Sequence, residues 1–133
     1  MFNALARTAG RVAIAPLFAV NGLAAAKAPG PRPQMAAPTL DALREYIPAI
    51  PNDDELVVRI NGGIQAAAGL TLGLGFFPKT SASVLAGSLI PTTIAGHAFW
   101  KEEDESKRAA QKTQFYKNAA IIGGLLAVVG SKK

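Results

Sequence analysis

The chain has no cysteine among its 133 residues, and only one histidine and one tryptophan. Without thiols it can form no disulfide, no thiolate metal site and no thiol–disulfide relay of its own. The single histidine, His97, argues against haem with two axial histidines, against iron–sulfur clusters and against structural zinc. We therefore expect no metal site and no cofactor that is bound covalently or through metal ligands.

Charged residues are missing from long stretches of the chain. Between Lys79 and Lys101 the only ionisable residue is His97. These residues number about 21 and would span about 30 Å as a helix, which matches the hydrocarbon core of a bilayer. The run ends at Trp100, where aromatic residues of membrane interfaces lie. The pattern predicts a membrane-spanning helix over 80–100.

Three further apolar runs cover residues 5–26, 56–77 and 115–130. Half of the chain is hydrophobic, and its mean hydropathy is +0.23, which suits a small membrane protein with one long polar loop. We expect a single all-α domain, residues 1–133, built as a bundle of four transmembrane helices. The last run is short, so Lys117 near its start would snorkel towards water.

The N-terminal run has a second interpretation. Arg7 and Arg11 followed by an apolar stretch and small residues at 24–28 also fit a secretory signal with a cleavage site. Pro16 and Asn21 suit the apolar core of a signal poorly. We favour a retained first helix, kinked at Pro16 because proline removes a backbone donor.

The nine acidic residues all lie in two segments, 41–55 and 102–105. In a four-span bundle both segments emerge on one side, and the other side carries bases without acids, namely Arg7, Arg11, Lys79, Lys132 and Lys133. The total number of Lys and Arg favours the acidic side as cytoplasmic, whereas short basic segments favour the other. We expect cytoplasmic termini. The net charge of +5 does not indicate nucleic-acid binding, because the basic residues flank apolar runs.

Six prolines lie between residues 28 and 54, which predicts extended backbone over much of this loop. Thr39 can cap a helix of about nine residues, too short to be stable alone. Its Leu40, Leu43 and Ile47 would face the bundle from the membrane interface. A linker without regular structure fits the same residues.

Small residues recur at steps of three and four in the second run, at Gly62, Ala66, Gly69 and Gly73. Such a stripe lets helix backbones approach closely. We expect it to pack inside the bundle, with homodimerisation as the alternative.

Polar residues near the helix ends form the candidate site. We expect the following residues to cluster near the acidic side: Lys27, Glu55, Arg59, His97, Trp100, Lys117 and Asn118. Glu55 and Arg59 are one helical turn apart and can pair. These groups either satisfy one another and fix the helix register or form the mouth of a quinone or lipid-headgroup site. A quinone needs donors at its carbonyls, such as His97, and an aromatic wall, such as Phe99 or Trp100.

Several segments together resemble the DoxX family of bacterial membrane proteins. They are residues 18–23 (Phe-Ala-Val-Asn-Gly-Leu), 89–93 (Leu-Ile-Pro-Thr-Thr), 97–100 (His-Ala-Phe-Trp) and 114–126, which begins Gln-Phe-Tyr-Lys-Asn. The resemblance implies a four-helix bundle in the bacterial inner (plasma) membrane. Family members are associated with membrane redox systems, including a thiosulfate:quinone oxidoreductase subunit and a complex with superoxide dismutase and a sulfurtransferase.

Two functions follow from the residues and the resemblance. The first is a non-catalytic accessory or scaffold subunit of a larger respiratory or envelope complex, in contact with lipids and other membrane subunits. The second is a quinone- or lipid-binding oxidoreductase subunit that uses His97 as hydrogen-bond donor or proton relay. The lack of a cofactor-ligand set favours the first.

Overall fold

The computed structural model describes residues 2–97 and 99–131, and the regular structure of this part of the chain is entirely helical. The predicted all-α fold is therefore confirmed. Five α-helices and one 3-10 turn follow each other: α1 (Phe2–Lys27), α2 (Arg32–Tyr46), α3 (Asp54–Leu74), α4 (Pro78–Gly96), η1 (Phe99–Lys101) and α5 (Glu105–Val129).

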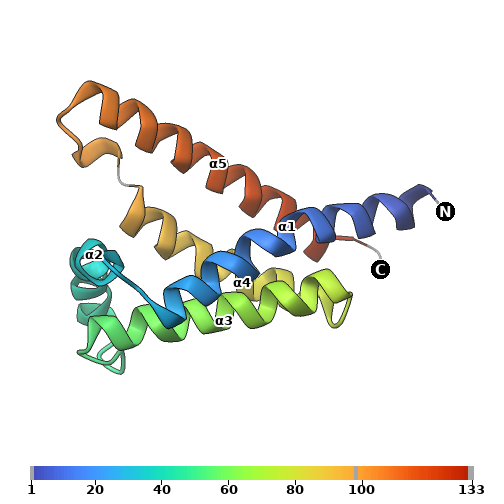
Figure 1. Ribbon diagram of the computed structural model, residues 1–133, viewed down its shortest axis with the longest axis horizontal. Helices are drawn as coiled ribbons and strands as arrows, with labels where there is room; N and C mark the ends of the chain where they lie inside the picture. The colour runs from blue at the N-terminus through green and yellow to red at the C-terminus, as the bar shows by residue number, and fades with distance from the viewer. Residues whose placement is uncertain (1, 98, 132–133) are drawn as a thin grey trace.

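The four long helices run back and forth along one direction, and α2 lies across one end of them (Figure 1). The connection from α4 to α5 lies at the same end as α2. Both chain ends and the turn between α3 and α4 lie at the opposite end. The two acidic segments therefore share the α2 end of the molecule. Lys132 and Lys133, which we expected among the bases of the opposite end, lie outside the described residues.

Local sequence explains where the helices begin and end. Asp53 and Asp104 cap α3 and α5, their carboxylates accepting from the backbone N–H groups of Leu56 and Ser106. At the other end of α3, Gly75 adopts a left-handed conformation (φ 84°) that glycine tolerates without strain. Pro78 then opens α4, where the N–H that proline lacks would have no helical partner.

The proline-rich segment contains the helix expected after Thr39, but this helix is longer than the sequence predicted. The segment is neither extended nor an unstructured linker over 32–46, because α2 occupies those 15 residues. The helix begins before Thr39, since Pro31 and Pro33 lie at its start, where missing N–H donors cost nothing. Leu40 is buried, as the predicted apolar side requires, whereas Ile47 follows the helix and is exposed. Packing against α3 and α4 thus stabilises a helix that propensity alone would not form.

The last two predicted spans also have different bounds. The run expected over 80–100 breaks after Gly96, and its final turn is the separate η1; Ala98 lies outside the described residues. Helix α5 begins at Glu105, well before residue 115, because its first turns contain strong helix formers such as Lys107, Arg108 and Gln111.

The small-residue stripe of α3 lies against α1. A methyl group added at Gly62 would lie 2.6 Å from the carbonyl oxygen of Gly22 and 2.9 Å from the backbone nitrogen of Ala26. One at Gly69 would lie 3.0 Å from the backbone nitrogen of Ala19, and one at Gly73 would lie 2.8 Å from the Ala15 side chain. The backbones of α1 and α3 are thus in contact, which only small residues permit.

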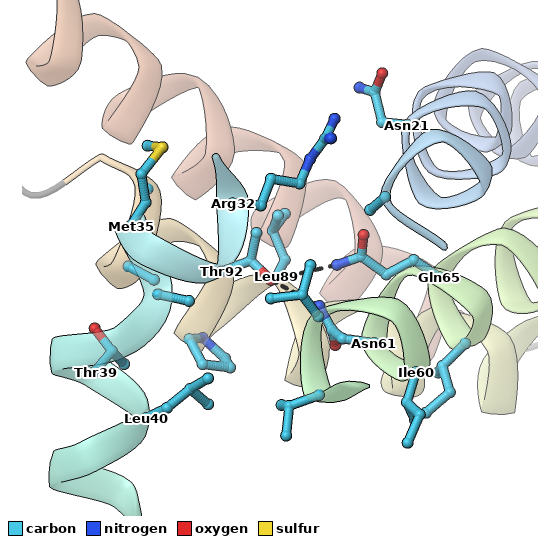
Figure 2. Close-up of a pocket in the computed structure, with 18 of the residues that line it drawn as sticks. Asn21, Arg32, Met35, Thr39, Leu40, Ile60, Asn61, Gln65, Leu89 and Thr92 are labelled. Carbon is cyan, nitrogen blue, oxygen red and sulfur yellow. Dashed lines mark hydrogen bonds between the residues drawn. The ribbon is translucent and has the colours of Figure 1, made fainter. Parts of the chain in front are cut away.

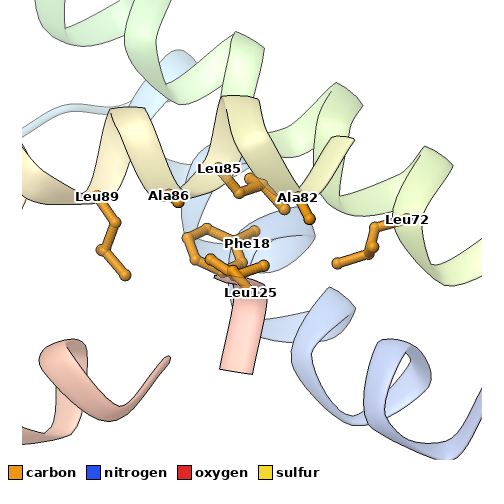
Figure 3. Packing of buried hydrophobic residues seen from close by; sticks show 7 residues of the cluster. All are labelled: Phe18, Leu72, Ala82, Leu85, Ala86, Leu89 and Leu125. Carbon is orange, nitrogen blue, oxygen red and sulfur yellow. The ribbon is translucent and has the colours of Figure 1, made fainter. Parts of the chain in front are cut away.

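A small apolar core joins all four long helices. Figure 3 shows Phe18 of α1 and Leu125 of α5 beside a row of α4 residues, and the cluster comprises Phe18, Leu72, Ala82, Leu85, Ala86, Leu89 and Leu125. Many other large apolar side chains are exposed; Leu70 of α3 and Leu126 of α5 are 57% and 56% exposed. A soluble monomer rarely exposes so much apolar surface.

Two helical segments are long and apolar enough to cross a membrane, namely α1 and Pro78–Lys101. Only 22% and 29% of their apolar windows are buried, whereas the core helix of a soluble protein is mostly buried.

Neighbouring glycines of α3 provide a test of the α1–α3 contact. Gly62→Ala forces backbones apart, and we expect it to lower the stability in detergent by about 1–3 kcal/mol. Gly63→Ala adds the same atoms where nothing lies within 4 Å. That change should be neutral or raise stability by up to about 1 kcal/mol through helix propensity. Thermal unfolding followed by circular dichroism compares the two, and equal midpoints would contradict the contact.

Candidate ligand pocket between the helices

A pocket of about 750 Å³ lies at the α2 end of the bundle. Helix α2 covers one side with Met35, Leu40 and Leu43, and α3 and α4 form the walls beneath it (Figure 2). Short stretches of α1 and α5 complete the lining. Most of the wall is aliphatic, and polar groups are confined to a few positions, as in small-molecule sites.

Four polar side chains of α3 and α4 form a hydrogen-bonded cluster at the pocket. Ser88 Oγ donates to Asn61 Oδ1 at 2.6 Å and accepts from Gln65 Nε2 at 2.8 Å. Thr92 Oγ1 accepts from Asn61 Nδ2 at 3.2 Å and from Gln65 Nε2 at 3.4 Å. Thr92 in turn donates to the Ser88 carbonyl at 2.8 Å. The cluster satisfies groups that would be costly in lipid and fixes the register of α3 against α4.

A second polar contact joins α5 to α4. Buried Asn118 donates through Nδ2 to Thr93 Oγ1 at 3.1 Å, and Thr93 donates to the Leu89 carbonyl at 2.6 Å. Asn118 and the adjacent Lys117 both line the pocket. The position of α5 is thereby fixed where its side chains reach the ligand space.

His97 lies where α4 ends, and its ring lines the pocket. Its Nδ1 lies 2.6 Å from Gln111 Oε1 of α5. Because a carboxamide oxygen can only accept, Nδ1 carries the proton in this contact. A neutral ring in this tautomer presents Nε2 as an acceptor. The donor of His97 is thus committed to Gln111.

The candidate residues separate into three groups. His97, Lys117 and Asn118 line the pocket. The predicted Glu55–Arg59 ion pair is present at 3.0 Å. Arg59 also donates to the Ala26 carbonyl at 2.7 Å and to the Lys27 carbonyl at 3.2 Å, and so caps the end of α1. Lys27 itself is exposed.

Trp100 belongs to the third group, an aromatic cluster with Phe99, Phe115 and Tyr116. Its ring centroid lies 5.3 Å from that of Phe99 and 5.8 Å from that of Phe115. Lys112 Nζ lies 5.9 Å from the Phe99 and Tyr116 rings, within reach of cation–π attraction. Neither Phe99 nor Trp100 lines the pocket, so the expected aromatic wall of a quinone site is not formed by them.

Sequence reasoning found only part of the pocket side that α2 forms. Arg32 and Met35 line it, but the prolines around them had predicted an extended loop, whereas Thr39 was expected to cap a short helix. Asn21, singled out only as a polar residue in an apolar run, also lines it. The periodicity of Leu40 and Leu43 was the one signal that pointed to this side.

Arg44 fastens the end of α2 to the start of α3. Its guanidinium donates to Asp54 and to the Pro51 carbonyl, both at 2.6 Å, and to Asp41 at 3.0 Å. The hydrogen bond that Arg44 donates to Asp54 raises the pKa of Arg44, and the attraction of its charge to Asp54 and Asp41 acts in the same direction, whereas desolvation lowers the pKa. This contact holds α2 over the pocket. Within the described residues no group of three His, Cys, Asp or Glu side chains could hold a metal ion.

The profile of the DoxX family matches residues 6–98. The chain belongs to the DoxX family. The matched region comprises α1 to α4, with all of the pocket except its α5 side, so the resemblance of residues 114–126 lies outside it. No curated protein and no solved structure matches the chain.

Proposed function

We propose that this DoxX protein is a non-catalytic subunit of a larger membrane redox or envelope complex, and that its bundle holds a lipid- or quinone-like ligand. The pocket is the observation that carries the ligand-binding part. Its volume of about 750 Å³ lies within the range of about 300–1,000 Å³ typical of small-molecule sites. Its aliphatic walls with a few polar groups suit an apolar body that ends in a polar head.

The proposal places α1, α3, α4 and α5 across the bacterial inner membrane as four spans. Helices α1 and α4 have the length and apolar composition for this. The charged residues of α3 are confined to 54–59, and α5 carries Lys117 alone after residue 112. The exposed apolar side chains of these helices then face lipid, which removes their cost in water.

The helix dipoles account for the acids at the α2 end of the bundle but not for the bases at the opposite end. The positive ends of the helix dipoles favour acids at the starts of α3 and α5, and this preference is the same whichever side of the membrane these helix ends face. At the opposite end α1 and α4 begin without acids, and Lys79 lies in the first turn of α4 against the dipole preference. The positive-inside rule accounts for such bases and supports cytoplasmic termini.

Single cysteines test the topology cleanly because the chain has none of its own. In inside-out and right-side-out vesicles, an impermeant thiol reagent should label Ser131→Cys and Asp104→Cys from opposite sides. A cysteine at Leu85, buried in the core, is the unreactive control. Labelling of both positions from the same side would contradict four spans.

Bulk placed in the pocket tests ligand binding. Ala36 on α2 lines the pocket, whereas Ala42 on the same helix is exposed and does not. We expect Ala36→Trp to displace lipid or quinone that co-purifies with the protein, and Ala42→Trp to retain it. Native mass spectrometry of the detergent-solubilised proteins measures the bound mass, and identical spectra would contradict a ligand in the pocket.

A stripe on α5 supports the role as a subunit. Ala119, Gly123 and Ala127 lie four residues apart and are all exposed, and nothing lies within 4 Å of the Gly123 Cβ position. Such a stripe on an outward face allows a helix of another membrane protein to approach closely.

Gly123→Leu should therefore reduce the co-purification of partner subunits from native membranes without lowering the folded yield. Ala109→Leu adds bulk to an exposed turn near the start of α5 and is the matched control. Equal recovery of partners with both variants would show that this face does not dock.

The second candidate function is a quinone-dependent oxidoreductase subunit that relays protons through His97. The position of His97 at the pocket favours it, whereas the commitment of Nδ1 to Gln111 opposes a donor role. His97→Gln keeps a donor and an acceptor but cannot titrate. We expect unchanged assembly on native gels and unchanged quinol turnover of the host complex. Retained assembly with slowed turnover would instead establish the proton relay.

A further inference from the structure

We infer that the pocket binds a single-chain amphiphile with an anionic head, namely a long-chain carboxylate, and that Arg32 and Lys117 bind the head. This inference rests on the proposed ligand-binding role and names the class of ligand. It starts from the charges at the pocket. All nine acids of the chain lie in the two segments at this end of the bundle, yet none of the lining residues is acidic. The charged lining residues are Arg32 and Lys117, both cations.

The two cations differ from their neighbours in the absence of an acidic partner. Arg44 and Arg59 form ion pairs with Asp41, Asp54 and Glu55. Among the described residues, neither Arg32 nor Lys117 is in such a pair. Both side chains are exposed beside the apolar walls, where they can reach an anionic head, and a bound carboxylate would supply the acidic partner that neither has.

The geometry of Arg32 prepares it for this role. One terminal nitrogen, Nη1, donates to the carbonyls of Ala28 and Pro29 at 3.3 and 3.2 Å, just after the end of α1. Its other nitrogens keep their donors, and the side chain extends on the same side of the pocket as Asn21 (Figure 2). A carboxylate accepts two parallel hydrogen bonds from a guanidinium held in this way.

Lys117 lies deeper along the bundle. It follows Gln111, the partner of His97, by six residues, or about 9 Å along the helix axis. It is the residue next to buried Asn118, whose bond to Thr93 fixes this part of α5 against α4. The backbone at Lys117 is therefore fixed beside the pocket, and the ammonium group on its flexible side chain can attract an anion there.

The remaining walls determine the body of the ligand. Leu17, Leu40, Leu43, Ile60, Ile64 and Leu89 offer aliphatic contacts. Each non-hydrogen atom of a ligand takes about 30 Å³, the volume of one water molecule in the liquid, so the pocket of 750 Å³ would hold about 25 such atoms. A saturated carboxylate of about 16–18 carbons fits within that space, whereas a complete two-chain phospholipid exceeds it. A neutral head would leave both cations without a counter-charge, and a cationic head would be repelled.

Binding of palmitate to the full-length chain in neutral detergent tests the inference. Hexadecanol and hexadecyltrimethylammonium have the same chain with a neutral and a cationic head. By equilibrium dialysis we expect one saturable palmitate site per chain. Arg32→Gln and Lys117→Gln should each weaken palmitate about tenfold and leave hexadecanol unchanged. Arg32→Lys should restore part of the affinity, and Lys107→Gln, an exposed position outside the pocket, should have no effect.

Each contrary outcome has a distinct meaning. If palmitate and hexadecanol bound equally well, and Lys117→Gln weakened the binding of neither, the preference for an anionic head would be wrong, although the pocket would still hold a ligand. If no probe bound saturably and Ala36→Trp displaced nothing, the proposed ligand-binding function would fail as well. If phosphatidylglycerol displaced palmitate from the Ala36→Trp variant as well as from the unchanged protein, the anion would bind at a headgroup surface outside the pocket, and the inference would be wrong.

Discussion

The backbones of α1 and α3 meet at Gly22 and Gly62 without side chains between them, and much of the structure depends on this contact. It brings the end of α1 beside α3, where Arg59 can donate to the Ala26 carbonyl. The chain then leaves α1 at a fixed place, and α2 follows within a few residues. Because α2 is fastened in turn to the start of α3 by Arg44, the cover of the pocket is positioned by one close helix crossing.

The contact between α3 and α4 is of another kind. Asn61 and Gln65 bond to Ser88 and Thr92, so polar groups join two helices whose other faces are apolar. Interhelical hydrogen bonds in membranes contribute only about 0.6 kcal/mol each on average. Their greater effect is on register, because a shift of one residue would leave carboxamides unpaired beside aliphatic side chains. This contact therefore determines which α4 residues face the pocket.

Much of this arrangement is readable from the sequence, and the parts that are not have a common cause. The apolar runs predicted α1, α3 and the start of α4 closely, since helix period and composition are local properties. The stripe from Gly62 to Gly73 indicated a close packing face, but its partner Gly22 carried no periodic signal. The part of helix α2 before Thr39 was missed because its prolines lower local helix propensity, and only packing against α3 and α4 compensates. The pocket could not be predicted as a whole, since its α2 side depends on that helix.

The two kinds of helix contact position the walls of the pocket in different ways. Backbones that touch, as at Gly62, have no rotamers to change, so no side-chain rearrangement can make room between α1 and α3 at this point. Helix α5 meets α4 through side chains such as Asn118 and Gln111, so its position depends on a few hydrogen bonds, and loss of the buried one from Asn118 would leave an unpaired carboxamide. Loss of a side-chain hydrogen bond would therefore disturb the α5 side of the pocket, whereas only added volume at the glycines would disturb the α1–α3 side.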